Sequence, residues 1–220
     1  MGRIYTKGEV VDYVWQYSRY YGNLLGYCTQ IYENENGHAS LIYLFNLVEN
    51  AFKENLSDYD SNFYSIIDTS YNRGFINEIE LNFLNDKTIG VRKIRNLLAH
   101  ANLSKFNIVF LNENKDLLFP LTENETCLKI YDLFSDILFN LILKIISKNF
   151  IIPICVDLND KINSLSYEIK EFSAEDILKD KGISVDYFID WEKKSESEKY
   201  RIAENSQNVN VLTEIFKHLK

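Results

Sequence analysis

The sequence predicts a mainly α-helical bundle that carries a small β-hairpin and a C-terminal helical appendage. Only two prolines and eight glycines occur among 220 residues, which favours long helices over a fold of strands and turns. Apolar residues make up 46% of the chain and aromatic residues 14%, enough for a packed core. Apolar side chains recur every three or four residues through most of the first 150 positions. We therefore expect a helical domain over residues 1–150 and an acidic helical appendage over residues 151–220.

Charge and cysteine usage narrow the class of protein. The formal net charge is −8, and charged residues begin too early in the chain for a signal peptide. Cys28, Cys127 and Cys155 form no Cys-x-x-Cys pair, which argues against a disulfide framework or a zinc site and fits a reducing compartment. The most apolar stretch, residues 133–146, contains polar and charged side chains and is too short to span a bilayer. We expect a cytoplasmic chain that does not enter the membrane.

The N-terminal segment predicts one helix that runs to about residue 31. Thr6 and Glu9 have the spacing of a capping box just ahead of an apolar run. Tyr13, Trp15 and Tyr20 lie off the main apolar stripe, so the helix is expected to pack on more than one side. Tyrosines at this spacing are typical of a core or a dimer surface, although they can also stack bases.

Four further helices are expected before residue 103, over residues 38–56, 64–67, 76–84 and 87–102. In the first of them, Glu49 and Lys53 have the spacing of an ordinary ion pair on one helix face.

After residue 103 the pattern changes. Two short apolar runs, residues 106–111 and 117–120, flank a polar stretch and predict a hairpin. Thr122 and Glu125 then have capping-box spacing at the start of a helix that reaches about residue 148. This helix is apolar over most of its circumference, so we expect it at the centre of the core.

The C-terminal segment contains two further cap signals. Ser173 is expected to cap a short helix that ends at Gly182, and Ser184 to cap another that continues through Trp191. Helix, turn and helix together suggest a helix-turn-helix unit. DNA binding is nevertheless unlikely, because the second helix offers acidic groups where DNA needs cations: Asp186, Asp190 and Glu192. A packing or partner-binding appendage fits this segment better.

A local basic zone stands out on this acidic chain. No Asp or Glu occurs between residues 87 and 112, whereas five cations do: Lys87, Arg92, Lys93, Arg95 and Lys105. Such a zone can bind an anion such as a nucleic-acid phosphate, or it can be an ordinary solvated helix face. Arg92, Asn96 and His100 follow one another at intervals of four and form a polar stripe. Arg95 lies about 140° around the helix from His100, so a frayed end or a second copy must bring the two together.

Arg95-Asn96-Leu97-Leu98-Ala99-His100 resembles the signature of the HEPN family (higher eukaryotes and prokaryotes nucleotide-binding). That signature is an Arg, usually followed by a polar residue, with a His after four to six intervening residues. The resemblance covers roughly residues 1–150 and implies a helical bundle of the HEPN type. Many members carry an acidic or polar residue on the long second helix, where Glu49 stands in this sequence.

The resemblance implies a metal-independent endoribonuclease, common among bacterial toxins and anti-phage defence proteins, with no cofactor. In such enzymes the RNA 2′-hydroxyl attacks its own phosphate and leaves a 2′,3′-cyclic phosphate and a 5′-hydroxyl. His100, with an unperturbed pKa of about 6.5, is suited to move a proton at neutral pH. Arg95 is suited to stabilise the charge that develops on the phosphate oxygens, and Asn96 to orient the ring or the phosphate.

Family resemblance also implies partners. Members usually dimerise through the motif-bearing helices, which would place two sets of Arg and His in one groove. Arg92, Lys93, Lys87 and Lys105 would then hold flanking phosphates of the RNA. An antitoxin or defence-complex partner is expected. Some toxins carry a Tyr two residues after the His that a nucleotidyltransferase modifies, but Asn102 stands there, so this control does not carry over.

Two alternatives stay open. The motif residues can be structural, with Arg95 in a salt bridge, Asn96 as a cap and His100 satisfied at a helix end. The chain would then be a catalytically silent HEPN-like module that binds a protein partner.

Overall fold

The computed structural model describes residues 2–100, 105–111, 118–121, 123–152 and 154–206. The chain divides into two compact units. The first comprises Met1–Ala101 and Thr122–Tyr167, and the second comprises Asn102–Leu121 and Glu168–Lys220. The division thus falls after Tyr167 instead of at residue 150, and it groups the hairpin with the C-terminal residues. The predicted mainly α fold with a small hairpin is confirmed.

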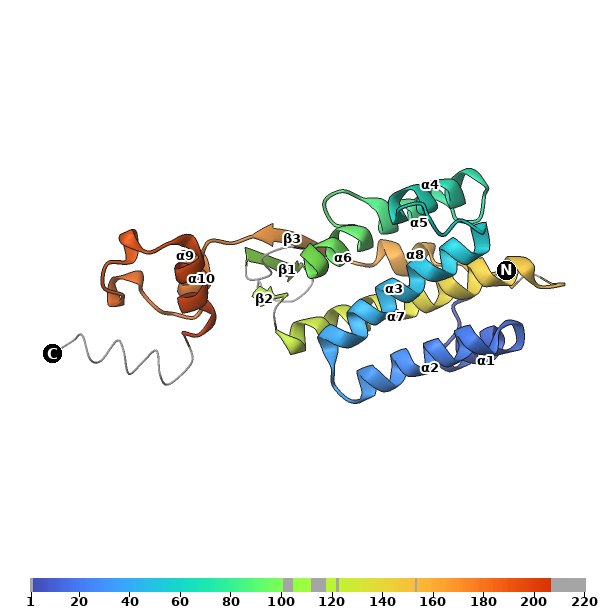
Figure 1. Cartoon of the computed structure of the whole chain (residues 1–220), viewed down its shortest axis with the longest axis horizontal. Coiled ribbons are helices and arrows are strands. Elements are labelled where there is room, and N and C mark those ends of the chain that lie inside the picture. The colour runs from blue at the N-terminus through green and yellow to red at the C-terminus, as the bar shows by residue number, and fades with distance from the viewer. Residues whose placement is uncertain (1, 101–104, 112–117, 122, 153, 207–220) are drawn as a thin grey trace. The chain divides into compact units, whose positions relative to one another are not determined.

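Two long helices form the centre of the first unit, α3 (Gly37–Leu56) and α7 (Asn124–Ile146). They lie side by side, with α1 and α2 on one flank and α4, α5 and α6 on the other (Figure 1). Ile137, Leu138 and Phe139 are consecutive and fully buried, so this part of α7 is enclosed over most of its circumference, as the sequence predicts, although the Asp136 side chain stays partly exposed. A 3₁₀ turn, η2 (Ser147–Asn149), follows α7. Neither α7 nor any other helix among the described residues is long and apolar enough to cross a membrane.

The N-terminal segment forms two helices, α1 (Lys7–Tyr17) and α2 (Arg19–Glu33), so the prediction of one continuous helix is wrong. Ser18 has extended backbone between them, and its side chain accepts a hydrogen bond from the Tyr21 amide, which caps α2. The two helices approach closely, because a Cβ atom at Gly22 would lie 2.9 Å from the Trp15 Cα atom.

The helix caps that the sequence predicts at Thr6 and Ser173 are present in the structure, and the one predicted at Thr122 begins at a residue that the structure does not describe. Both hydrogen bonds of the Thr6–Glu9 capping box are present at the start of α1, as predicted. The box that begins at Ser173 is likewise confirmed, with Asp176 as its acidic member. Thr122 lies outside the described residues, and the N-cap of α7 is Glu123, whose side chain makes no capping hydrogen bond.

Three short helices follow α3: α4 (Phe63–Asn72), α5 (Glu78–Asn85) and α6 (Val91–His100). The motif of residues 95–100 lies in α6. This helix begins four residues later than the sequence predicts, because Asp86 organises a turn before it. The Asp86 carboxylate accepts hydrogen bonds from the Thr88 and Ile89 amides, at 2.7 and 2.9 Å. Gly90 completes this turn, and a Cβ atom there would lie 2.6 Å from backbone atoms of Asp86.

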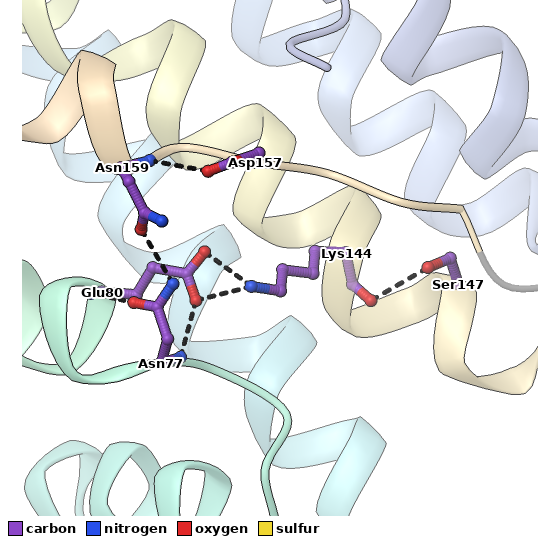
Figure 2. A network of polar contacts seen from close by, with 6 residues as sticks. All are labelled: Asn77, Glu80, Lys144, Ser147, Asp157 and Asn159. Atoms are coloured by element: carbon purple, nitrogen blue, oxygen red, sulfur yellow. Dashed lines mark hydrogen bonds and ion pairs between the residues drawn. The ribbon is translucent and has the colours of Figure 1, made fainter. Parts of the chain in front are cut away.

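A buried ion pair ties α5 to α7 (Figure 2). Glu80 is fully buried, and both its carboxylate oxygens lie 2.7 Å from Lys144 Nζ. The Asn77 amide donates to the same carboxylate at 2.9 Å, and the Asn77 side chain donates to Asn159 Oδ1 at 2.9 Å. Asn159 begins α8 (Asn159–Asn163), so the network includes a segment that follows residue 150.

The second unit combines a small sheet with short helices. The sheet contains β1 (Phe106–Phe110), β2 (Leu118–Pro120) and β3 (Tyr167–Glu171), in the order β2-β1-β3. Strands β1 and β2 are antiparallel, with Ile108 opposite Phe119, and the hairpin turn lies outside the described residues. Helices α9 (Ala174–Asp180) and α10 (Glu196–Glu204) share a core cluster that includes Leu178 and Trp191.

The predicted helix-turn-helix is wrong, because no second α-helix follows α9 at Ser184. Ser184 does cap a short element, but that element is a 3₁₀ turn, η3 (Val185–Tyr187), and η4 (Trp191–Lys193) is another. Asp190 separates the two turns with a φ of 55°, in the left-handed region, which a continuous helix excludes. Among the described residues of this segment there is no recognition helix for DNA.

Candidate functional site

The motif arginine lies against α3 and α4. Arg95 Nη2 is 2.5 Å from Glu49 Oε2, and the guanidinium carbon is 6.0 Å from the centre of the Phe63 ring. Glu49 belongs to α3 and Phe63 begins α4, so Arg95 links three helices of the first unit. The structure thus brings together two residues that the sequence analysis proposed for the site, although they are far apart in the chain.

Glu49 is buried, with 8% of its surface exposed, and it pairs with two cations. Lys53 Nζ lies 3.0 Å from its second carboxylate oxygen, so the expected pair along α3 is confirmed. A buried carboxylate is costly unless cations compensate for its lost hydration. We call Glu49, Lys53 and Arg95 the ion triad. It fixes the direction of the Arg95 side chain, which is still 30% exposed.

Arg92 has a different environment, although it lies only one turn before Arg95. Its Nε atom donates a hydrogen bond to Asn85 Oδ1 at 2.9 Å. Its guanidinium carbon lies over the Tyr64 ring, 5.2 Å from the ring centre. Within the described ranges no carboxylate pairs with Arg92, so its charge is held in place by neutral groups.

The other two motif residues lie towards the end of α6. Asn96 is half-buried, and its side chain makes no hydrogen bond with another described residue. His100 is the last residue of α6, and its side chain lies outside the described part of the structure. Asn102 is also outside it.

The three lysines that were expected to hold RNA have different environments. Lys87 is exposed in the turn before α6, and Lys93 is half-buried on α6 itself. Lys105 belongs to the second unit, where its Nζ lies 2.5 Å from Glu196 and 3.8 Å from Glu171. The hydrogen bond with Glu196 raises the pKa of Lys105 above its ordinary value. Lys105 is therefore compensated inside its own unit.

Sequence reasoning missed Tyr64 and Asn85 as members of this site. Tyr64 is 48% exposed on α4, and the Asn85 side chain donates to the Tyr64 carbonyl at 3.4 Å. Both residues reach Arg92 through the packing of α4, α5 and α6. The spacing along the chain does not indicate that contact, because it depends on how α4, α5 and α6 pack against one another.

Glu49 pairs with Lys53 and Arg95, whereas Arg92 contacts Asn85 and Tyr64, so these direct contacts include three cations and one carboxylate. The surplus is positive on a chain whose net charge is −8, so the region is suited to an anion. Elsewhere, burial raises the pKa of the Cys28 and Cys127 thiols to about 11, which disfavours the thiolate that a nucleophile requires. Among the described residues, no three His, Cys, Asp or Glu side chains are grouped to hold a metal ion.

Comparisons of this chain with protein-family models, with curated proteins and with solved structures found no match. The HEPN resemblance therefore rests on the sequence alone.

Proposed function

We propose that the chain is a metal-independent endoribonuclease of the HEPN type, acting on RNA in a bacterial toxin–antitoxin or anti-phage defence system. The ion pair between Arg95 of α6 and the buried Glu49 of α3 is what the structural alternative also expects; the observation that carries this proposal is that the paired Arg95 side chain remains 30% exposed. A motif arginine fixed by a buried carboxylate presents its remaining donors in a set direction, which is what stabilisation of a phosphorane requires.

In the proposed reaction, the His100 imidazole accepts the proton of the RNA 2′-hydroxyl while its oxygen attacks the adjacent phosphorus atom. The bond from phosphorus to the 5′-oxygen breaks, and this oxygen takes a proton from water and leaves as a 5′-hydroxyl, while the His100 imidazolium returns its proton to solvent. Arg95 donates hydrogen bonds to the non-bridging oxygens as their negative charge increases. Asn96, one turn before His100, orients the imidazole or the phosphate. A homodimer through α6 would bring Arg95 of one copy to His100 of the other.

The experiment is RNA cleavage by the purified chain in EDTA, with the product ends analysed. His100→Ala is expected to lower the rate by at least about 100-fold, the contribution typical of general acid–base catalysis. The matched control is His38→Ala, because His38 lies half-buried near the start of α3, outside the motif. Products without cyclic phosphate ends, or equal activity in His100→Ala, would exclude the proposed mechanism.

Arg95 needs a variant that separates catalysis from folding. Arg95→Lys keeps a cation beside Glu49 but loses the planar fork of donors, so the ion triad stays compensated. We expect Arg95→Lys to have near-native circular dichroism and thermal stability and a cleavage rate at least about 10-fold lower. Native cleavage by this variant would show that the Arg95 fork is not part of the reaction.

A second function is favoured by a separate surface. Trp15, Tyr20 and Tyr27 on α1 and α2 are 43%, 66% and 54% exposed, as is typical of surfaces that bind proteins. A folded chain that cleaves no RNA would support this catalytically silent interaction module.

A further inference from the structure

Tyr64 and Arg92 bring an aromatic ring and a cation into contact. The guanidinium lies over the ring, and 48% of Tyr64 is exposed. The Asn85 side chain holds both partners, because it accepts from Arg92 Nε at 2.9 Å and donates to the Tyr64 carbonyl at 3.4 Å. This arrangement is built from α4, α5 and α6, all within the first unit. Asn85 therefore links the Arg92 side chain to the backbone of Tyr64, and the Tyr64 ring contacts the Arg92 guanidinium.

Two arginines of α6 each contact an aromatic ring of α4, but only one of the two arginines is paired with a carboxylate. Arg95 lies over Phe63, which is only 3% exposed, and its charge is compensated by Glu49. Arg92 lies over the exposed Tyr64, and no carboxylate among the described residues compensates it. The ring in the first pair is buried and its arginine is paired with a carboxylate, whereas the second pair offers an exposed ring and an arginine that no described carboxylate pairs with.

We propose that Tyr64 and Arg92 form a nucleotide subsite, in which an unpaired base stacks on the Tyr64–Arg92 pair and a phosphate binds Arg92. A nucleotide is the ligand class that combines a planar group with an adjacent anion, and aromatic rings and arginine planes are its usual stacking surfaces. The base must be unpaired, because a paired base has both faces covered within the duplex. This inference rests on the proposed function, since it gives the ribonuclease a residue that positions its substrate beside Arg95.

The test measures the binding of a fluorescent single-stranded oligouridine by fluorescence anisotropy, with full-length chain carrying His100→Ala to prevent cleavage. Tyr64→Ala is expected to weaken binding by about tenfold, the loss typical of one stacked base, and Tyr64→Phe to preserve it. Tyr27→Ala is the matched control, because Tyr27 is similarly exposed (54%) but lies on α2. Unchanged binding in a folded Tyr64→Ala variant would overturn the subsite.

Two further variants test the charge. Arg92→Gln is expected to weaken binding and to reduce the slope of log affinity against log salt by about one unit, as loss of one phosphate contact predicts. Asp68 stands four residues after Tyr64 on α4 and accepts a hydrogen bond from Asn72, so its negative charge lies about one helical turn from Tyr64 and would repel a phosphate bound there. Asp68→Asn is therefore expected to tighten binding by about twofold. An Arg92→Gln salt slope equal to the parent slope would contradict phosphate binding by Arg92.

Failure of the subsite and failure of the proposed function give different results. If the chain cleaves no RNA but Tyr64→Ala and Arg92→Gln lose binding, the subsite is supported and the ribonuclease is not. If the chain cleaves RNA and Tyr64→Ala has the same cleavage rate and the same affinity as the parent, the ribonuclease is supported and the subsite is excluded. If single-stranded and duplex oligonucleotides bind equally and Tyr64→Ala affects neither, stacking of an unpaired base is excluded.

Discussion

At the scale of single residues, the two buried carboxylates of the first unit serve different purposes. Glu80 is fully buried and pairs with one lysine in a closed network that contains no exposed cation. Glu49 pairs with two cations, one of which belongs to the motif helix and is partly exposed. The first arrangement is suited to holding helices together, and the second is suited to positioning a partly exposed arginine.

Glu80→Gln is expected to destabilise the chain strongly, because it leaves the Lys144 ammonium with no opposite charge in a site where its side chain is only 16% exposed. Breaking a buried pair in this way typically costs about 3–5 kcal/mol in the free energy of unfolding, measurable by urea denaturation.

The control for Glu80 is Lys161→Met. Lys161 lies 3.8 Å from Asp136 with both side chains about two-fifths exposed, at 42% and 41%. Exposed pairs contribute less than about 1 kcal/mol, so this variant should unfold close to the parent. Equal losses for the two variants would mean that burial does not determine the contribution of Glu80.

The sequence indicated some site residues and not others for identifiable physical reasons. Arg95 was proposed from a six-residue motif, and Glu49 because many HEPN members carry an acidic or polar residue on the long second helix. Tyr64 was not found, because its role depends on the packing of α4 against α6. Lys105 was grouped with the arginines because it is near in sequence, yet it belongs to a different unit.

At the scale of secondary-structure elements, the break at Ser18 and the contact beside it decide how α1 and α2 pack. Apolar residues keep their helical spacing on both sides of Ser18, so periodicity alone predicts one helix. The break depends instead on the Ser18 cap of α2 and on close contact at Gly22. The bounds of α3 were predicted to within one residue, because it has neither such a cap nor such a contact in its interior.

Gly22 and Gly26 form a matched pair for testing this account, since both lie within α2. A Cβ atom at Gly22 would lie 2.9 Å from the Trp15 backbone, so Gly22→Ala is expected to destabilise by about 1–3 kcal/mol through overpacking. No heavy atom lies within 4 Å of a Cβ atom at Gly26, so Gly26→Ala should stabilise by about 0.5–1 kcal/mol. Thermal unfolding of both variants measures the difference, and stabilisation by Gly22→Ala would contradict the close approach.

At the scale of the whole molecule, the units are not consecutive pieces of chain. The second unit is formed by Asn102–Leu121 together with Glu168–Lys220, while the first resumes between them. The sequence analysis placed the boundary between residues 150 and 151. The contacts place it later, because Tyr167 packs on Phe134 with ring centres 5.2 Å apart and its hydroxyl donates to the Ile89 carbonyl at 2.6 Å.

Truncated chains test this boundary. A chain of residues 1–150 loses Asn159 and the buried Tyr167, whereas a chain of residues 1–167 keeps both, and neither contains α9 or α10. We expect residues 1–167 to be more stable by at least about 3 kcal/mol, the cost typical of losing one buried aromatic side chain. Chemical unfolding followed by circular dichroism provides the comparison. Equal midpoints would place the end of the first unit before residue 150.

The strand order β2-β1-β3 has a consequence for biosynthesis. Strand β1 can pair with β2 as soon as both leave the ribosome, but its other edge waits for β3, which is encoded after all of α7 and α8. At about 5–20 residues per second, translation needs roughly 3–10 s to cover that interval. During this time the Phe-Asn-Ile-Val-Phe edge of β1 is open, and such edges pair readily with other chains. Nascent copies on one polysome are therefore most prone to associate in this interval, and any pause within codons 122–166 prolongs it.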